Sequence, residues 1–141
     1  MMAKILIAAF GEESRMYVAR SKQRGLEVRV LDCFDEYRLR LVRWFGEDVL
    51  KVQGHRADVR RAVADEGFDA ALVHDPGDLV RTALIVQALH DAGVPNVLVV
   101  THDAQRRAIY SRCGAHRVLL AFHPEQAWQV VSRELPSFVS A

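Results

Sequence analysis

The stretch KILIAAFGEESRMYVARSKQRGLEVRVLD, from Lys4 to Asp32, decides the fold of this chain. Residues 4–8 and 27–31 are two short apolar runs of the kind that forms strands buried on both faces of a sheet. The residues between them have room for one helix. Because strand–helix–strand units are almost always right-handed, this one predicts a parallel sheet whose first loop opens at the carboxyl edge of the strands.

That first loop lies where doubly wound sheets bind ligands. Dinucleotide-binding sheets carry G-x-G-x-x-G there, because the backbone must turn tightly, approach a pyrophosphate and pack against the helix. The corresponding residues are Ala9, Gly11 and Ser14, so only the glycine that lets a phosphate approach is kept. Asp32 follows at close to the spacing, about 20 residues, of an acid that accepts hydrogen bonds from a ribose. Two alternatives remain open: a nucleotide in this loop, or a loop that has lost its ligand.

Two acidic residues favour the loss of the ligand. Glu12 and Glu13 fall in the first turn of the predicted helix, where the helix dipole and free N–H groups stabilise carboxylates. A pyrophosphate binds in the same place. We expect the two carboxylates to repel it unless Arg15 or a metal ion compensates.

Length and composition describe an ordinary single domain spanning residues 1–141. The formal net charge is +1, which gives no indication of a nucleic-acid partner. Cys33 and Cys113 lack C-x-x-C spacing, so neither a disulfide framework nor a zinc site is predicted. We find no signal peptide and no apolar run near the about 20 residues that span a bilayer. A cytoplasmic protein without direct membrane insertion is expected.

The rest of the chain alternates between strand and helix patterns. Further strands are predicted at 49–52, 69–73, 96–100 and 117–121, and helices at 35–45, 58–66, 78–92, 104–112 and from Pro124 to Pro136. Alternation within 39–41 leaves a strand as the other interpretation of the segment 35–45. The expected fold is a three-layer, doubly wound, Rossmann-like α/β domain with six parallel strands in the order 3-2-1-4-5-6.

The whole chain resembles the N-terminal regulatory domain of potassium channels and potassium uptake systems, called RCK, KTN or TrkA-N. The family opens with strand, G-x-G-x-x-G, helix, Gly, strand and Asp, which Lys4 to Asp32 match without a gap. Later matches are Gly54-His55 for a Gly-Asp pair after the third strand, His74 to Asp78 for a polar loop, Gly93-Val94-Pro95 for a turn, and 108–115 for a helix end.

The resemblance implies a non-enzymatic regulatory subunit that binds NAD(H) or ATP/ADP and relays this binding to the membrane subunit of a potassium channel or transporter, as a homodimer or larger ring. The implied ligand lies across the first loop, with Asp32 on the ribose, Cys33 beside it, His55 near the base, and His74 and Asp75 at the phosphates. The implied loop residues are Ala9, Phe10, Gly11, Ser14 and Arg15. The alternative is a degenerate Rossmann or pseudo-receiver domain that binds no nucleotide and acts as a protein interaction module.

The pseudo-receiver alternative comes from a second resemblance, to the receiver domains of response regulators, that begins at Asp69. In it Asp75 would be the phosphoacceptor and Thr101 the hydroxyl that reports phosphorylation. Ala9-Phe10 stands in place of the magnesium-binding acids and Ala121 in place of the lysine, and phosphoryl transfer uses that cation.

Four histidines each follow a predicted strand and could gather at one edge: His55, His74, His102 and His123. If they gather, pH or metal sensing becomes a hypothesis, because imidazole changes charge near neutrality. No histidine pair has the spacing of a metal motif, and no nucleophile elbow is present. Catalysis is therefore not expected.

Overall fold

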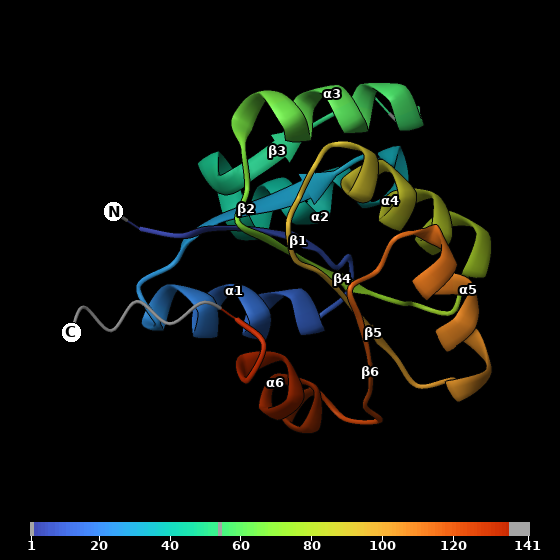
Figure 1. Cartoon of the computed structure of the whole chain (residues 1–141). Coiled ribbons are helices and arrows are strands. Elements are labelled where there is room, and N and C mark those ends of the chain that lie inside the picture. The colour runs from blue at the N-terminus through green and yellow to red at the C-terminus, as the bar shows by residue number, and fades with distance from the viewer. Residues whose placement is uncertain (1, 54, 136–141) are drawn as a thin grey trace.

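A computed structural model describes residues 2–53 and 55–135 (Figure 1). Six strands form one parallel sheet in the order β3-β2-β1-β4-β5-β6, which confirms the predicted order. The strands are β1 (Lys4–Ala8), β2 (Glu27–Asp32), β3 (Val49–Lys51), β4 (Ala70–His74), β5 (Val97–Thr101) and β6 (Arg117–Leu120).

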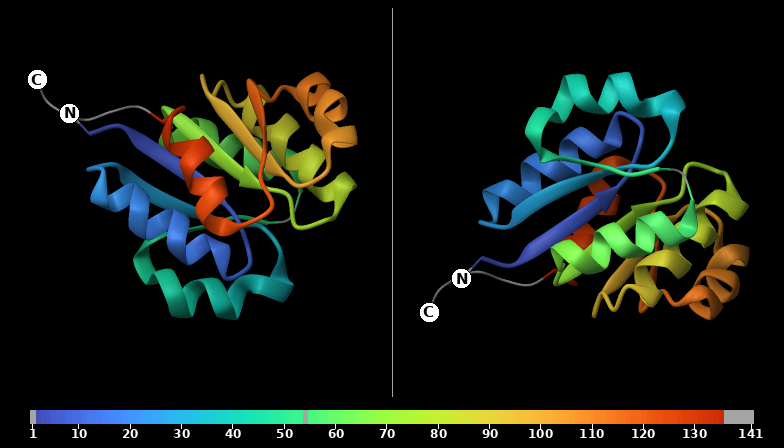
Figure 2. Two further views of the ribbon diagram at one scale, coloured as in Figure 1. Left: turned by 90° about the horizontal axis from the view of Figure 1, so that it is seen from below. Right: turned by 90° about the horizontal axis from the view of Figure 1, so that it is seen from above.

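The strands alternate with six α-helices: α1 (Glu13–Gln23), α2 (Asp35–Phe45), α3 (Arg56–Glu66), α4 (Leu79–Asp91), α5 (Arg107–Cys113) and α6 (Pro124–Ser132). Two short 3₁₀ turns, η1 (Gly46–Asp48) and η2 (Ala104–Arg106), precede β3 and α5. Helices α1 and α6 pack together on one face of the sheet, while α3, α4 and α5 form a row on the other (Figure 2). The three-layer expectation is thus confirmed, and the segment 35–45 is a helix.

Both faces of the central strands are buried. Ile5, Leu6 and Ile7 of β1 are no more than 1% exposed, and every residue of β5 is buried. This explains why these strands appear in the sequence as continuous apolar runs instead of alternating ones. The apolar runs therefore place the core on both sides of β1, β4 and β5.

Helix boundaries shift where local capping decides them. Helix α3 begins at Arg56 and not at the predicted Asp58. His55 is the last residue with an extended backbone, and its carbonyl accepts the first helical hydrogen bonds, from the N–H groups of Asp58 and Val59. The predicted helix 104–112 divides into η2 and α5. The expected Gly54 match and the Pro136 helix stop lie outside the described residues.

The chain changes direction in the sheet between β1 and β4. These strands are neighbours, with Ala8 opposite Val73, but β1 leads into α1 on one face and β4 into α4 on the other. The loops after them diverge at the carboxyl edge, and such a switch point is where open α/β sheets form a crevice.

Candidate functional site

A cleft of about 390 Å³ lies at this switch point. It is bordered by the loops after β1, β4 and β5 together with one side of α2. Its lining residues are Phe10, Gly11, Glu13, Tyr37, Arg40, His74, Asp75, Pro76 and His102. Of the ten site residues expected from the sequence, four line the cleft: Phe10, Gly11, His74 and Asp75.

The Gly11 loop is held in a compact turn. The Ser14 hydroxyl donates to the Gly11 carbonyl at 2.7 Å, and Ser14 is fully buried. Ala9 is also fully buried, so both residues that replace glycines in the motif serve the packing of the turn. Small side chains suffice there, and the loop keeps its shape without the two outer glycines.

The Glu13 carboxylate lies against the backbone that Gly11 leaves open. The Gly11 N–H donates to Glu13 Oε1 at 3.2 Å, and a Cβ atom on Gly11 would lie 2.5 Å from Glu13 Oε2. Glu13 is the first residue of α1, where free N–H groups and the helix dipole favour an anion. A resident carboxylate therefore occupies the position expected for a ligand phosphate. The sequence places Glu13 in the first turn but does not show that its side chain folds back.

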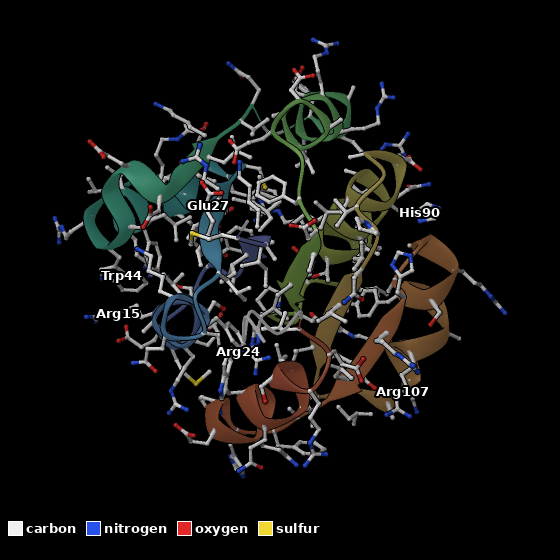
Figure 3. The ribbon with its side chains drawn as sticks, turned by 60° about the vertical axis from the view of Figure 1, so that its left-hand side comes forward. Arg15, Arg24, Glu27, Trp44, His90 and Arg107 are labelled. Carbon is white, nitrogen blue, oxygen red and sulfur yellow. The ribbon has the colours of Figure 1, made fainter. Side chains whose placement is uncertain are left out.

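Arg15 does not compensate this charge. Its guanidinium pairs with Glu12 at 3.0 Å on the exposed surface and lies 5.3 Å from the centre of the Trp44 ring. Figure 3 shows Arg15 and Trp44 together at the outer side of the molecule. Arg15 thus belongs to the contact between α1 and α2, not to the lining of the cleft.

Asp32, at the carboxyl end of β2, is a fully buried carboxylate with one oxygen free. Arg38 Nε donates to Asp32 Oδ2 at 2.9 Å, whereas Oδ1 has no hydrogen-bond partner within the described part of the chain. A buried carboxylate oxygen without a donor costs stability, so a ligand hydroxyl that donates here would relieve that cost. Neighbouring Cys33 is buried, and burial followed by the charge of Asp32 raises the pKa of its thiol to about 12.

An aromatic cluster borders the cleft, and Asp32 is not among the residues that line it. Phe10 stacks on Tyr37 with ring centres 5.2 Å apart and meets the edge of Phe34 at 5.3 Å. Arg40 donates to the Phe10 carbonyl at 3.0 Å, and the Arg81 guanidinium covers Phe34 at 4.4 Å. Tyr37 fits the helical stripe of α2, but the sequence did not indicate that this stripe meets the first loop.

A smaller cavity of about 60 Å³ lies between the end of β2 and helices α3 and α4. Cys33, Phe34, Arg56 and Arg81 contribute to its lining. His55, expected near a base, is exposed at the start of α3 and is not among the lining residues, whereas the adjacent Arg56 is.

Asp75 is locked into a buried hydrogen-bond network. Its carboxylate accepts from Tyr110 OH at 2.7 Å, Thr101 Oγ1 at 3.0 Å, Arg106 Nη1 at 3.0 Å and Gly77 N–H at 2.8 Å. Burial alone would raise the pKa of Asp75, but these hydrogen bonds outweigh burial and hold its pKa below the usual value. Only 2% of Asp75 is exposed, so this carboxylate supports the loop and is not presented for phosphorylation.

His74 joins the two sides of the switch point. Its Nδ1 lies 2.9 Å from Tyr17 OH on α1, and its Nε2 lies 3.9 Å from Glu13 Oε1. Burial lowers the pKa of His74, and nearby His102 lowers it further, while Glu13 and Asp75 act in the opposite direction. The net effect of this environment is to favour the neutral imidazole of His74 over the charged form.

Three of the four edge histidines do gather. His74, His102 and His123 line a second cavity of about 190 Å³ beside the cleft. His55 does not join them. Across residues 2–53 and 55–135, no group of three His, Cys, Asp or Glu side chains is arranged to hold a metal ion.

Comparisons with known proteins identify the fold through structure alone, since no protein-family model and no curated protein matches the sequence. The GsuK channel bound to NAD has a TM-score of 0.61 at 14% identity over 84% of this chain and 21% of that chain. This chain thus spans about a fifth of the channel chain's length. The TrkA-N domain of the inner membrane protein ybaL from Escherichia coli has a TM-score of 0.63 at 16% identity, over 96% of this chain and 98% of that one.

The chemotaxis protein CheY4 from Vibrio cholerae is also similar, with a TM-score of 0.58 at 17% identity over 96% of this chain and 100% of that one. CheY-type sheets have the strand order 2-1-3-4-5. The order here contains that arrangement once β3 is set aside, which accounts for the likeness. The complete six-strand sheet has the doubly wound Rossmann order.

The structure also bears on membrane insertion. No helix among the described residues combines the length and the apolar character that crossing a bilayer requires.

Proposed function

We propose that this protein is a non-enzymatic, nucleotide-binding regulatory domain of a potassium transport system. Its ligand is NAD(H) or an adenine nucleotide, and its partner is the membrane subunit of a channel or transporter, which it meets in the cytoplasm as a homodimer or larger ring. Similarity to the GsuK channel bound to NAD, to the GsuK RCK domain and to a TrkA-N domain supports this proposal.

One observation supports the ligand most directly: the free Oδ1 atom of buried Asp32. Rossmann sheets use an acid at this place to accept hydrogen bonds from a ribose. The fit differs between the two halves of a nucleotide. Asp32 suits the ribose, whereas Glu13 already occupies the Gly11 N–H that a phosphate would use.

Thermal unfolding with NADH, NAD, ATP, ADP and adenosine tests the ligand. A ligand at about 100 times its dissociation constant stabilises a protein by about 2.7 kcal/mol, which for a chain of this size is a shift of several degrees. Asp32→Asn keeps the side-chain shape, and we expect it to weaken binding by about 1.5–3 kcal/mol, the worth of a hydrogen bond to a charged group.

Asp35→Asn is the matched control. Asp35 Oδ1 also contacts Arg38, at 2.9 Å, but its side chain is 94% exposed. The control should bind as the wild type does. Equal weakening by both substitutions would mean that only the anchoring of Arg38 matters, and no stabilisation by any of the five ligands would refute nucleotide binding.

The transport role needs a cellular test. We expect deletion of the protein from its source cells to change potassium uptake, with recovery by the wild type and not by Asp32→Asn. Unchanged uptake in the deletion strain would refute that role while leaving the binding result intact.

A further inference from the structure

The carboxyl edge of the sheet holds two cavities with a common wall. The 390 Å³ cleft over β1 and β4 and the 190 Å³ cavity over β4, β5 and β6 are both lined by Glu13, His74, Asp75 and His102. Asp75 is fixed by its hydrogen bonds, and His74 is held by Tyr17. The polar contacts of Glu13 are one 3.2 Å hydrogen bond and a 3.9 Å approach to His74, so Glu13 is held more weakly than either Asp75 or His74.

The position of Glu13 conflicts with a bound phosphate in both space and charge. Its carboxylate accepts the Gly11 N–H, the group that a phosphate would need. Among the described residues, the group within ion-pair distance of Glu13 is His74, whose pKa is lowered by burial. Arg15, the arginine nearest to Glu13 along the sequence, is paired with Glu12, and Arg40, which lines the same cleft, donates to the Phe10 carbonyl. Within the described residues, neither arginine is within ion-pair distance of the Glu13 carboxylate.

We propose that Glu13 is the specificity-determining residue of this edge: its carboxylate occupies the phosphate position on Gly11 and separates the two cavities. A nucleoside, which has no phosphate, binds without displacing Glu13. A phosphorylated ligand, whether a mononucleotide or a dinucleotide, binds only after the carboxylate leaves Gly11. This inference rests on the proposed nucleotide site and specifies which ligands it takes.

The test compares Glu13→Ala, Glu13→Gln and Glu12→Gln by calorimetric titration with adenosine, ADP and NAD. Glu13→Ala removes both the obstruction and the charge, so the dissociation constants for ADP and NAD should fall by at least about tenfold, the effect of relieving a close like-charge contact. The constant for adenosine should change by less than about twofold, because adenosine carries no charge to repel. Glu13→Gln removes the charge but keeps an acceptor for Gly11, so its gain should be smaller.

Glu12→Gln is the control for long-range charge. Glu12 precedes Glu13, is 76% exposed and paired with Arg15, and its side chain does not accept the Gly11 N–H. A tightening of ADP and NAD binding by Glu13→Ala that Glu12→Gln does not reproduce would support the proposal. Equal tightening by both, tightening that includes adenosine, or no tightening would overturn it.

Two further readouts separate this inference from the proposed function. In the first case, adenosine binds to the wild type, Asp32→Asn weakens that binding, and Glu13→Ala brings no gain for ADP or NAD. This result would retain the nucleotide site and reject the role of Glu13. No binding of any ligand to the wild type or to Glu13→Ala would reject both. The amide resonance of Gly11 should shift in Glu13→Ala while those of distant strands stay in place, and an unmoved Gly11 resonance would refute the contact itself.

Discussion

Tyr110→Phe removes a single oxygen atom, and we expect it to lower the free energy of unfolding substantially. The Tyr110 hydroxyl donates to Asp75 Oδ2 at 2.7 Å, and both residues are buried. A hydrogen bond to a charged group is worth about 1.5–3 kcal/mol, and here the acceptor cannot turn to water instead. Since 1 kcal/mol corresponds to about 2–4 °C in a domain of this size or somewhat larger, we expect the melting temperature to fall by about 3–12 °C near neutral pH.

The pH dependence of that loss is a sharper test. The pKa of Asp75 is lower in the folded state than in the unfolded state. The hydrogen bonds to Asp75 therefore stabilise the protein fully at pH values above the unfolded-state pKa. This stabilisation is lost as pH falls through the folded-state pKa. Tyr110→Phe removes a donor to the ionised form and raises that pKa. The difference in unfolding free energy between the two proteins should therefore shrink between about pH 7 and about pH 3, where carboxylates become protonated.

Urea unfolding of both proteins at several pH values measures this difference. Tyr37→Phe is the control, because Tyr37 is only half-buried and stacks on Phe10 through its ring. It should change stability by less than about 0.5 kcal/mol. A loss below about 0.5 kcal/mol for Tyr110→Phe, or a difference that stays constant with pH, would refute the assignment of Asp75 as an ionised, hydrogen-bonded buttress.

Two other predictions concern the start of α4 and the two thiols. Asp78→Ala should lower the free energy of unfolding by about 1 kcal/mol in chemical unfolding, because Asp78 Oδ1 caps α4 by accepting the Arg81 N–H at 3.0 Å. Asp78→Ser should keep most of the stability, and equal losses in the two variants would argue against the cap. Cys33 should react with iodoacetamide much more slowly than half-buried Cys113 under native conditions, because burial raises the pKa of the Cys33 thiol to about 12. Mass spectrometry of the labelled peptides measures the two rates, and modification of Cys33 before Cys113 would contradict the prediction.

Most of the fold could be predicted because its signals are local. The apolar runs of β1, β4 and β5 are continuous since both faces of the sheet are covered, and a right-handed crossover leaves few ways to order six such strands. The predicted start of the helix 78–92 depends on a contact that is also local: Asp78 accepts the N–H of Arg81, three residues further on.

The candidate site was only partly predictable because its contacts join distant segments. Asp75 was expected at the edge, but its partners Thr101 and Tyr110 lie on β5 and α5. They convert an apparent phosphoacceptor or phosphate neighbour into a buried support. Arg15 was expected to face a ligand, yet Trp44 and Glu12 hold it at the surface. Such choices depend on which side chains the packed helices bring within reach.

The sequence by itself determined the strand order, the switch point between β1 and β4, and the presence of Gly11, Glu13 and Asp32 at the ends of adjacent strands, because hydrophobic periodicity and crossover handedness act along the chain. Only the tertiary structure decided how these groups are used. It turned the Glu13 carboxylate onto the Gly11 N–H and left Asp32 Oδ1 without a donor. Both outcomes depend on side-chain directions and on competition for hydrogen bonds between segments, which the spacing of residues in a sequence does not specify.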